Sequence, residues 1–144
     1  MPVSGCCVGI AIADSSGHGL PAALLARDVI TALRTAAGQG TAVAGIVGRV
    51  NGVIQRAALS GTFVSLFYGQ LSDDGTLEYC NAGHELPLLI SRNGIHRLDV
   101  GGTVLGPLPL ALYESGLVSF CRETRKPLLG RVLRVFLASE INAF

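Results

Sequence analysis

The chain has 144 residues, of which 49% are hydrophobic and only 15% are charged, and its formal net charge is +1. This length fits a single domain, and the composition excludes an intrinsically disordered chain. A charge so close to neutral also argues against a nucleic acid or an anionic membrane surface as the partner.

Cysteine spacing and hydropathy predict a cytoplasmic protein with no membrane span. Neither a zinc site nor a redox motif matches the spacing of the four cysteines, which are Cys6, Cys7, Cys80 and Cys121. We expect buried thiols in a reducing compartment. The apolar N-terminal run lacks the basic region of a signal peptide. The longest uncharged stretch, 57–72, is shorter than the ~20 apolar residues of a membrane helix.

A strand and two helices are expected in the first part of the chain. Residues 8–13 alternate between branched and small side chains, which predicts a strand with one well-buried face. Apolar residues at helical spacing over 20–33, with Pro21 in the first turn, predict a helix with a broad apolar face. Thr41 is expected to cap a second helix with inward apolar positions from 43 to 54. Three glycines in that helix indicate either close backbone approach or a weak helix.

The second part of the chain is expected to form antiparallel strands. A period of two over 62–71, a turn at 72–75 and a return strand over 76–81 predict a hairpin. Further strands are expected at three places, 87–91, 95–98 and 117–121. A loop rich in glycine and proline follows residue 98, and the apolar segment 131–138 fits a strand or a helix. Together the elements predict an α+β fold with helices covering one face of a sheet.

Residues 14–19, with the sequence DSSGHG, join the first strand to the first helix. A carboxylate at the end of a buried strand is costly unless it is paired or bound to metal. Small residues after Asp14 let a cation or phosphate approach the backbone closely. Gly17 and Gly19 allow positive φ around His18, and the next helix presents free N–H groups. This arrangement suits a hard metal ion that holds a phosphoryl group. Alternatively, Asp14 caps the helix or forms an Asx turn, and His18 makes only a local hydrogen bond.

Three segments resemble, in order, the stage II sporulation protein E-type phosphatases, a bacterial branch of the metal-dependent, protein phosphatase 2C-like family. They are ADSSGHGLPAALLA (13–26), GTFVSLFYGQLSDDGTLEYCNAGHELPLLI (61–90) and GGTVLGPLP (101–109). The resemblance extends from residue 5 to about residue 116, and residues 117–144 diverge. It implies a single partial phosphatase domain over residues 1–144.

The resemblance implies an incomplete αββα fold, in which two antiparallel sheets are sandwiched between helices. In such enzymes, two Mn²⁺ or Mg²⁺ ions between the sheets activate a water that attacks phosphoserine or phosphothreonine. By this resemblance Asp14 bridges the metals, and Ser15 offers its backbone carbonyl to one of them. His84 braces a turn between strands. The loop beside the substrate consists of Ser16, Gly17, His18 and Gly19.

The resemblance also implies further metal carboxylates, which this sequence does not supply at the expected places. The earlier G-G-D-x-x-D-like segment of the family has no match, and residues 117–144 contain no Asp-Gly. Glu140 is the nearest substitute by position. Other carboxylates lie in a helix, a turn or a segment that the family does not use: Asp28, Asp73, Asp74 and Asp99. We therefore expect a chain truncated at both ends, with open sheet edges through which it can self-associate.

Three functions remain open at this point. The first is a metal-dependent serine/threonine phosphatase domain whose substrate, by resemblance, is a phosphorylated bacterial regulatory protein such as an anti-anti-sigma factor. The second is a catalytically inactive remnant of the same fold that acts as a binding or regulatory module. The third is an unrelated α+β protein that binds phosphate at residues 14–19.

Overall fold

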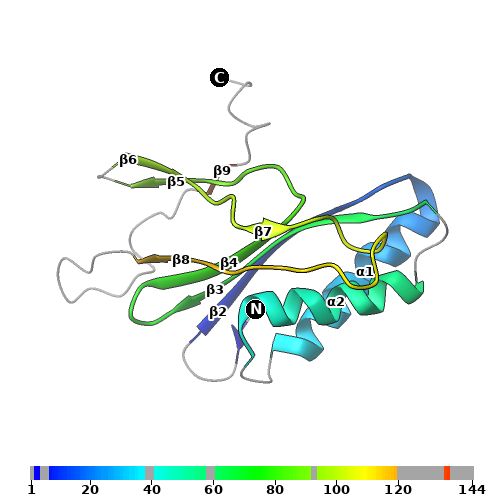
Figure 1. Ribbon diagram of the computed structural model, residues 1–144, viewed down its shortest axis with the longest axis horizontal. Helices are drawn as coiled ribbons and strands as arrows, with labels where there is room; N and C mark the ends of the chain where they lie inside the picture. Colours follow the sequence, from blue (N-terminus) through cyan, green and yellow to red (C-terminus); the bar gives the residue numbers. More distant parts are fainter. Residues whose placement is uncertain are drawn as a thin grey trace.

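The structure is a computed structural model that describes residues 2–3, 7–37, 41–57, 61–91, 94–119 and 135–136. Within these residues, two helices pack on one side of a six-stranded sheet, and a three-stranded sheet packs on the other side (Figure 1). The layers are therefore α–β–β. The α+β class with two sheets is confirmed, and the second helix layer of an αββα sandwich has no counterpart among the described residues.

The larger sheet has the order β1-β2-β3-β4-β7, and β8 pairs with β4 as well. Its neighbours are antiparallel except for β4 and β7, which are parallel. Its strands are β1 (Pro2–Val3), β2 (Cys7–Ser15), β3 (Val64–Ser72), β4 (Thr76–Ala82), β7 (Gly101–Gly102) and β8 (Gly116–Ser119). The smaller sheet consists of β6 (Gly94–Arg97), β5 (Leu88–Ser91) and β9 (Val135–Phe136), in that order.

The two helices are α1 (Gly19–Ala36) and α2 (Val43–Ala57). Neither described helix is long and apolar enough to cross a membrane. The inward stripe of α1 is narrow and consists of Leu25, Val29, Leu33 and Ala36. The prediction of a broad buried apolar face on this helix is wrong. Three residues of the predicted face have side chains that are 42–71% exposed: Leu20, Leu24 and Ile30. At about 100° per residue, these three project at least about 100° away from Val29.

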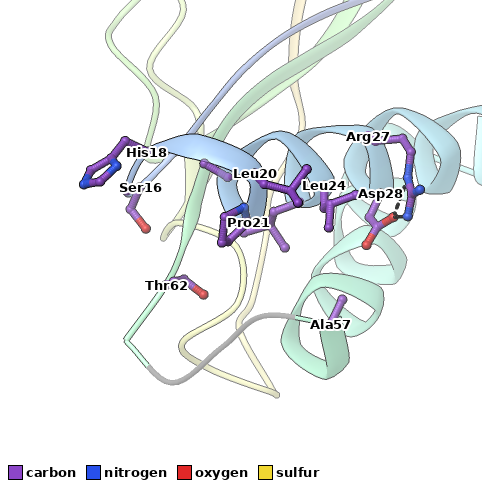
Figure 2. Close-up of a pocket in the computed structure, with 12 residues that line it drawn as sticks. Ser16, His18, Leu20, Pro21, Leu24, Arg27, Asp28, Ala57 and Thr62 are labelled. Carbon is purple, nitrogen blue, oxygen red and sulfur yellow. Dashed lines mark hydrogen bonds and ion pairs between the residues drawn. The ribbon is translucent and has the colours of Figure 1, made fainter.

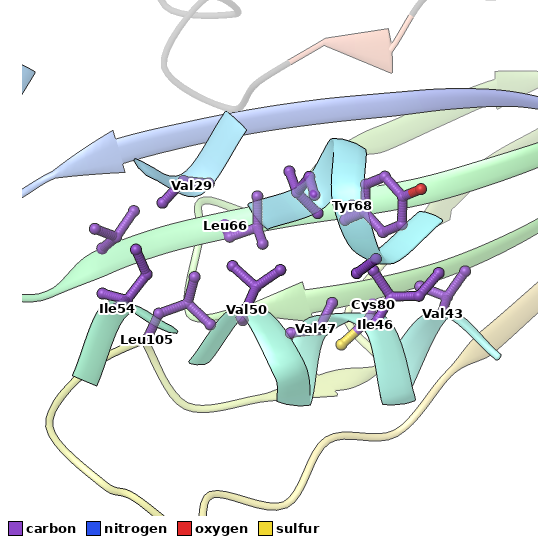
Figure 3. Close-up of a cluster of buried hydrophobic side chains, with 14 of the residues drawn as sticks. Val29, Val43, Ile46, Val47, Val50, Ile54, Leu66, Tyr68, Cys80 and Leu105 are labelled. Carbon is purple, nitrogen blue, oxygen red and sulfur yellow. The ribbon is translucent and has the colours of Figure 1, made fainter. Parts of the chain in front are cut away.

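The main core lies between the helices and the larger sheet (Figure 3). It receives five buried residues from α2: Val43, Ile46, Val47, Val50 and Ile54. These side chains face Leu66 and Tyr68 of β3 and Cys80 of β4 (Figure 3). Because successive side chains of a strand point to opposite faces, Phe67 lies on the other side of the sheet. There it joins a second cluster with Leu89 of the smaller sheet.

Polar contacts from distant residues hold α2 in place. The N–H groups of Val43 and Ala44 donate to Glu78 Oε1 and Ser115 Oγ, both at 2.9 Å. Asn51 is only 2% exposed. Its Nδ2 donates to the Leu108 carbonyl oxygen, and its Oδ1 accepts a hydrogen bond from the Gly106 N–H, both at 2.9 Å. These bonds satisfy helix-end and buried polar groups and join α2 to β4 and to the loop before β8.

The strand prediction for β2 is confirmed, but its predicted buried face is wrong. Val8 is 53% exposed, and Ile10 and Ile12 are partly exposed. The register pairs Ile12 with Phe67, so these side chains lie on the face toward the smaller sheet. The cluster between the sheets includes residues of β3 and β4 and, among the described residues, none of β2. The desolvation argument for a carboxylate at the end of this strand therefore does not apply.

Burial raises the pKa of the Cys80 thiol from 9.0 to about 12. The unfolded chain therefore releases this proton at a lower pH than the folded chain, and the folded state loses stability as the pH rises through this window. We expect the urea midpoint to fall more steeply between about pH 9 and pH 11 in the wild type than in Cys80→Ala. Burial and the charge of Cys80 both raise the pKa of Tyr113, to about 12, so the loss of Cys80 also removes part of the Tyr113 contribution and adds to the difference in slope. Parallel slopes would contradict this prediction.

Candidate functional site

Asp14 is the penultimate residue of β2, and Ser65 of β3 is its direct partner. Direct partners in an antiparallel pair project from the same face. This is also the face that carries Phe67, because residues two apart in a strand share a face. Asp14 is exposed, and no cation or hydrogen-bond donor among the described residues contacts its carboxylate. The carboxylate is therefore available to a ligand on the side of the smaller sheet.

The two residues after Asp14, Ser15 and Ser16, are held in place by hydrogen bonds to neighbouring elements. The hydroxyl of Ser15, the last residue of β2, donates to the Ala22 carbonyl of α1 at 3.1 Å. Ser16 forms two hydrogen bonds with Phe63: its N–H donates to the Phe63 carbonyl at 2.9 Å, and its Oγ accepts from the Phe63 N–H at 2.8 Å. The start of the predicted substrate loop is thus fixed to the residue before β3.

The glycines of the loop have the conformation that the sequence predicted. Gly17 has φ +91° and Gly19 has φ +74°, a region that favours glycine. His18 between them is extended and is the N-cap residue of α1, without a side-chain capping bond. Asp14 lies four residues before this cap, so the alternative that Asp14 caps the helix is wrong. His18 is exposed, and its ring points away from α1 (Figure 2).

A pocket of about 410 Å³ lies beside this loop, between the first half of α1 and the end of α2 (Figure 2). Its wall includes Leu20, Pro21, Leu24 and Ala57 as well as residues 16–18. The two charged residues of the wall, Arg27 and Asp28, form an ion pair with each other at 3.0 Å. The pocket is therefore mainly apolar, and its one carboxylate is already paired.

The described residues contain no group of three or more histidine, cysteine, aspartate or glutamate side chains that could hold a metal ion. Two further carboxylates are already hydrogen-bonded: Asp74 accepts a hydrogen bond within the β3–β4 turn, and Glu78 accepts one from the start of α2. Glu140 lies outside the described residues. Two dications need several carboxylates. Asp14 with one backbone carbonyl thus does not fit a two-metal centre.

His84 closes a turn after β4, as the sequence predicted. Its N–H donates to Asn81 Oδ1 at 2.7 Å, and its carbonyl accepts from Asn81 Nδ2 at 3.1 Å. Gly83 within the turn has φ +67° and lies against Val104. The His84 ring also reaches β3, with Nδ1 at 2.9 Å from Ser65 Oγ. Sequence reasoning missed Ser65, because a serine in a strand carries no signal of the partner it will meet.

Residues 4–125 match the model of the family described as stage II sporulation protein E (SpoIIE). The chain belongs to the SpoIIE family. Over 102 residues it is 30% identical to phosphoserine phosphatase RsbU of Bacillus subtilis (strain 168), covering 69% of this chain and 30% of RsbU. The third function, an unrelated phosphate-binding protein, is therefore wrong.

Solved structures of SpoIIE-type domains share the fold. The RsbU and RsbW domains of a Mycobacterium tuberculosis protein superpose with a TM-score of 0.65 at 26% identity, over 78% of this chain and 33% of theirs. The protein phosphatase 2C domain of SpoIIE from Bacillus subtilis, with a fragment of its regulatory domain, also superposes with a TM-score of 0.65, at 15% identity. This match covers 80% of this chain and 34% of the SpoIIE chain. The chain therefore has the fold of the SpoIIE-type phosphatase domains and spans about a third of the length of these relatives.

Replacing Gly17 should destabilise the domain, whereas replacing a helical glycine should stabilise it. A Cβ at either Gly17 or Gly48 meets nothing within 4 Å, so only the backbone conformation differs between the two sites. We expect Gly17→Ala, at positive φ, to lower the free energy of unfolding by about 1–2 kcal/mol. Gly48→Ala within α2 should raise it by about 0.5–1 kcal/mol. Urea unfolding of both variants checks this, and the same sign in both would contradict it.

Proposed function

We propose that this SpoIIE-family chain contributes to a metal-dependent protein serine/threonine phosphatase that hydrolyses phosphoserine or phosphothreonine on a bacterial regulatory protein. The observation that carries the proposal is the Asp14 carboxylate, exposed and without a partner among the described residues, on the sheet face toward the smaller sheet. The glycine-containing loop 16–19 and the N-terminus of α1 follow it directly. Free N–H groups at a helix start favour an anionic ligand such as phosphate.

The proposed substrate is a phosphorylated regulatory protein such as an anti-anti-sigma factor. Similarity to RsbU, which is named a phosphoserine phosphatase, supports a phosphoserine substrate. Similarity to a Mycobacterium tuberculosis protein that contains both RsbU and RsbW domains supports a role in regulation through other proteins. The pocket beside the loop offers an apolar wall to a bound protein segment.

A cytoplasmic location stays a prediction of the sequence.

The proposed cofactor is Mn²⁺ or Mg²⁺, with Asp14 and the Ser15 carbonyl as ligands. These two groups alone do not balance two dications. The proposal therefore requires further carboxylates from outside the described residues, and Glu140 is one candidate within this chain.

A non-catalytic binding or regulatory module is the second candidate function. The lack of a metal-holding cluster among the described residues favours it. In this case the SpoIIE fold persists, and the domain acts by holding a partner rather than by hydrolysis.

Metal titration of matched aspartate variants separates the two candidates. Asp14→Asn and Asp73→Asn make the same isosteric change, and Asp73 lies in the exposed turn after β3. For a phosphatase, we expect the wild type and Asp73→Asn to bind Mn²⁺ in calorimetry and to dephosphorylate a phosphoserine protein. Asp14→Asn should lose both properties. Absence of Mn²⁺ binding and of turnover in the wild type would favour the non-catalytic module.

We also propose that the chain self-associates through the edge of β2. β1 pairs only with Cys7 and Val8, and no described strand pairs with this edge from Ile10 to Ser15. An edge strand with unpaired backbone groups is a template for pairing with another chain. We expect the apparent mass in light scattering to rise with protein concentration. A monomer at every concentration would contradict this.

A further inference from the structure

The pocket beside the loop 16–19 is lined by apolar groups of both helices. Pro21 and Leu24 of α1 form part of one wall, and Ala57 at the end of α2 forms part of another (Figure 2). The volume of the pocket is about 410 Å³, whereas a cavity of about 150 Å³ already holds a benzene-sized group. The pocket therefore has room for a bulky apolar side chain.

The charges in the pocket wall neutralise each other. Nε and Nη2 of Arg27 both contact Asp28 Oδ1, at 3.3 and 3.0 Å, and no other acid or arginine lines the pocket among the described residues. Neither group is therefore left as an unpaired partner for a charged ligand. Burial of an apolar side chain against Leu24 and Pro21, in contrast, is favourable in proportion to the area that leaves water. The wall thus favours an uncharged, apolar occupant.

Exposed apolar residues continue from the pocket along the same end of the larger sheet. Thr62 belongs to the pocket wall, and the next residue, Phe63, is 40% exposed. The backbone of both lies against Gly106, and two residues further along the chain Leu108 is 55% exposed. Leu108 is held in place, because its carbonyl accepts a hydrogen bond from Asn51 Nδ2 at 2.9 Å. An apolar surface that extends past the pocket fits a polypeptide segment better than a small molecule.

The pocket and the proposed phosphate site are neighbours in the chain. Ser16 lines the pocket and lies two residues after Asp14, so at most about 7 Å separate their Cα atoms. Its two hydrogen bonds with Phe63 fix Ser16 in this place. An extended polypeptide advances about 3.3 Å per residue. A segment whose phosphoserine lies at the loop therefore brings a side chain about two to four residues away to the pocket.

We propose that the pocket is a specificity subsite, which binds a leucine-sized apolar side chain about two to four residues from the phosphoserine of the substrate protein. This inference rests on the proposed function, because it assumes that phosphoserine binds beside the loop 16–19. It deepens that function, since it names the sequence feature by which a substrate is selected. Burial of a side chain of this size strengthens binding by about 10-fold or more.

Matched peptides test this without requiring turnover. The probes are short phosphoserine peptides of glycine and asparagine, in which a single leucine or alanine is moved stepwise away from the phosphoserine. In chemical-shift titrations of the full chain, we expect leucine about two to four residues away to bind about 10-fold more tightly than alanine at the same position.

Three variants show whether the pocket causes this preference. Leu24→Ala removes an apolar contact of the wall, and Ala57→Leu fills the space, so both should abolish the preference for leucine. Ile30→Ala changes an exposed apolar residue of the same helix outside the pocket wall, and it should keep the preference. Circular dichroism verifies that each variant is folded.

Equal affinity for leucine and alanine peptides, no binding of any peptide, or a preference that survives in both Leu24→Ala and Ala57→Leu would overturn the inference. The same peptides with unmodified serine separate this result from a failure of the proposed function. If phosphoserine is preferred over serine but leucine is not preferred over alanine, the proposed function stands and the subsite is wrong. If leucine is preferred through Leu24 but phosphoserine is not preferred, the pocket binds as inferred and the proposed function fails.

Discussion

The antiparallel pairing of β2 with β3 is the interaction on which the candidate site depends. It runs over nine residue pairs, from Cys7 opposite Ser72 to Ser15 opposite Val64. A slip of one residue would move every side chain of β2 to the other face of the sheet. Asp14 would then point toward the helices instead of toward the smaller sheet. The register therefore determines whether the carboxylate lies on the face toward the smaller sheet or on the face toward the apolar core.

The two strands of this pair differ in how much of their surface is buried. β3 packs Leu66 and Tyr68 against the helices and Phe67 against the smaller sheet, so it is buried on both faces. β2 shares this sheet, but its apolar residues are much more exposed. A strand of this kind combines a rigid backbone, fixed by the hydrogen bonds of β3, with an accessible surface. Functional groups are well placed on such elements, because the scaffold supplies the precision and the surface supplies access.

Much of this fold could be predicted from local patterns in the sequence. The period of two in residues 62–71 and the Ser-Asp-Asp-Gly turn identify β3 and its hairpin with β4. The glycines after Asp14 indicate a loop with positive φ, whereas the role of Asp14 itself stays a prediction of the sequence. Burial of β2 could not be predicted, because it depends on which element covers the strand. The hydrogen bonds of Asn51 and Ser65 could not be predicted either. Their partners lie 55–57 and 19 residues away, and no local period encodes such contacts.

The capping of α2 has a consequence for the order in which the chain folds. The acceptors for its first two N–H groups lie 35 and 71 residues further along the sequence. The helix also contains three glycines, which weaken it in isolation. Long chain segments must therefore close before the start of this helix is satisfied, and such closure slows folding. We therefore expect the start of α2 to become stable only when the sheet and the loop before β8 have assembled, so that the helicity of α2 would report on their assembly.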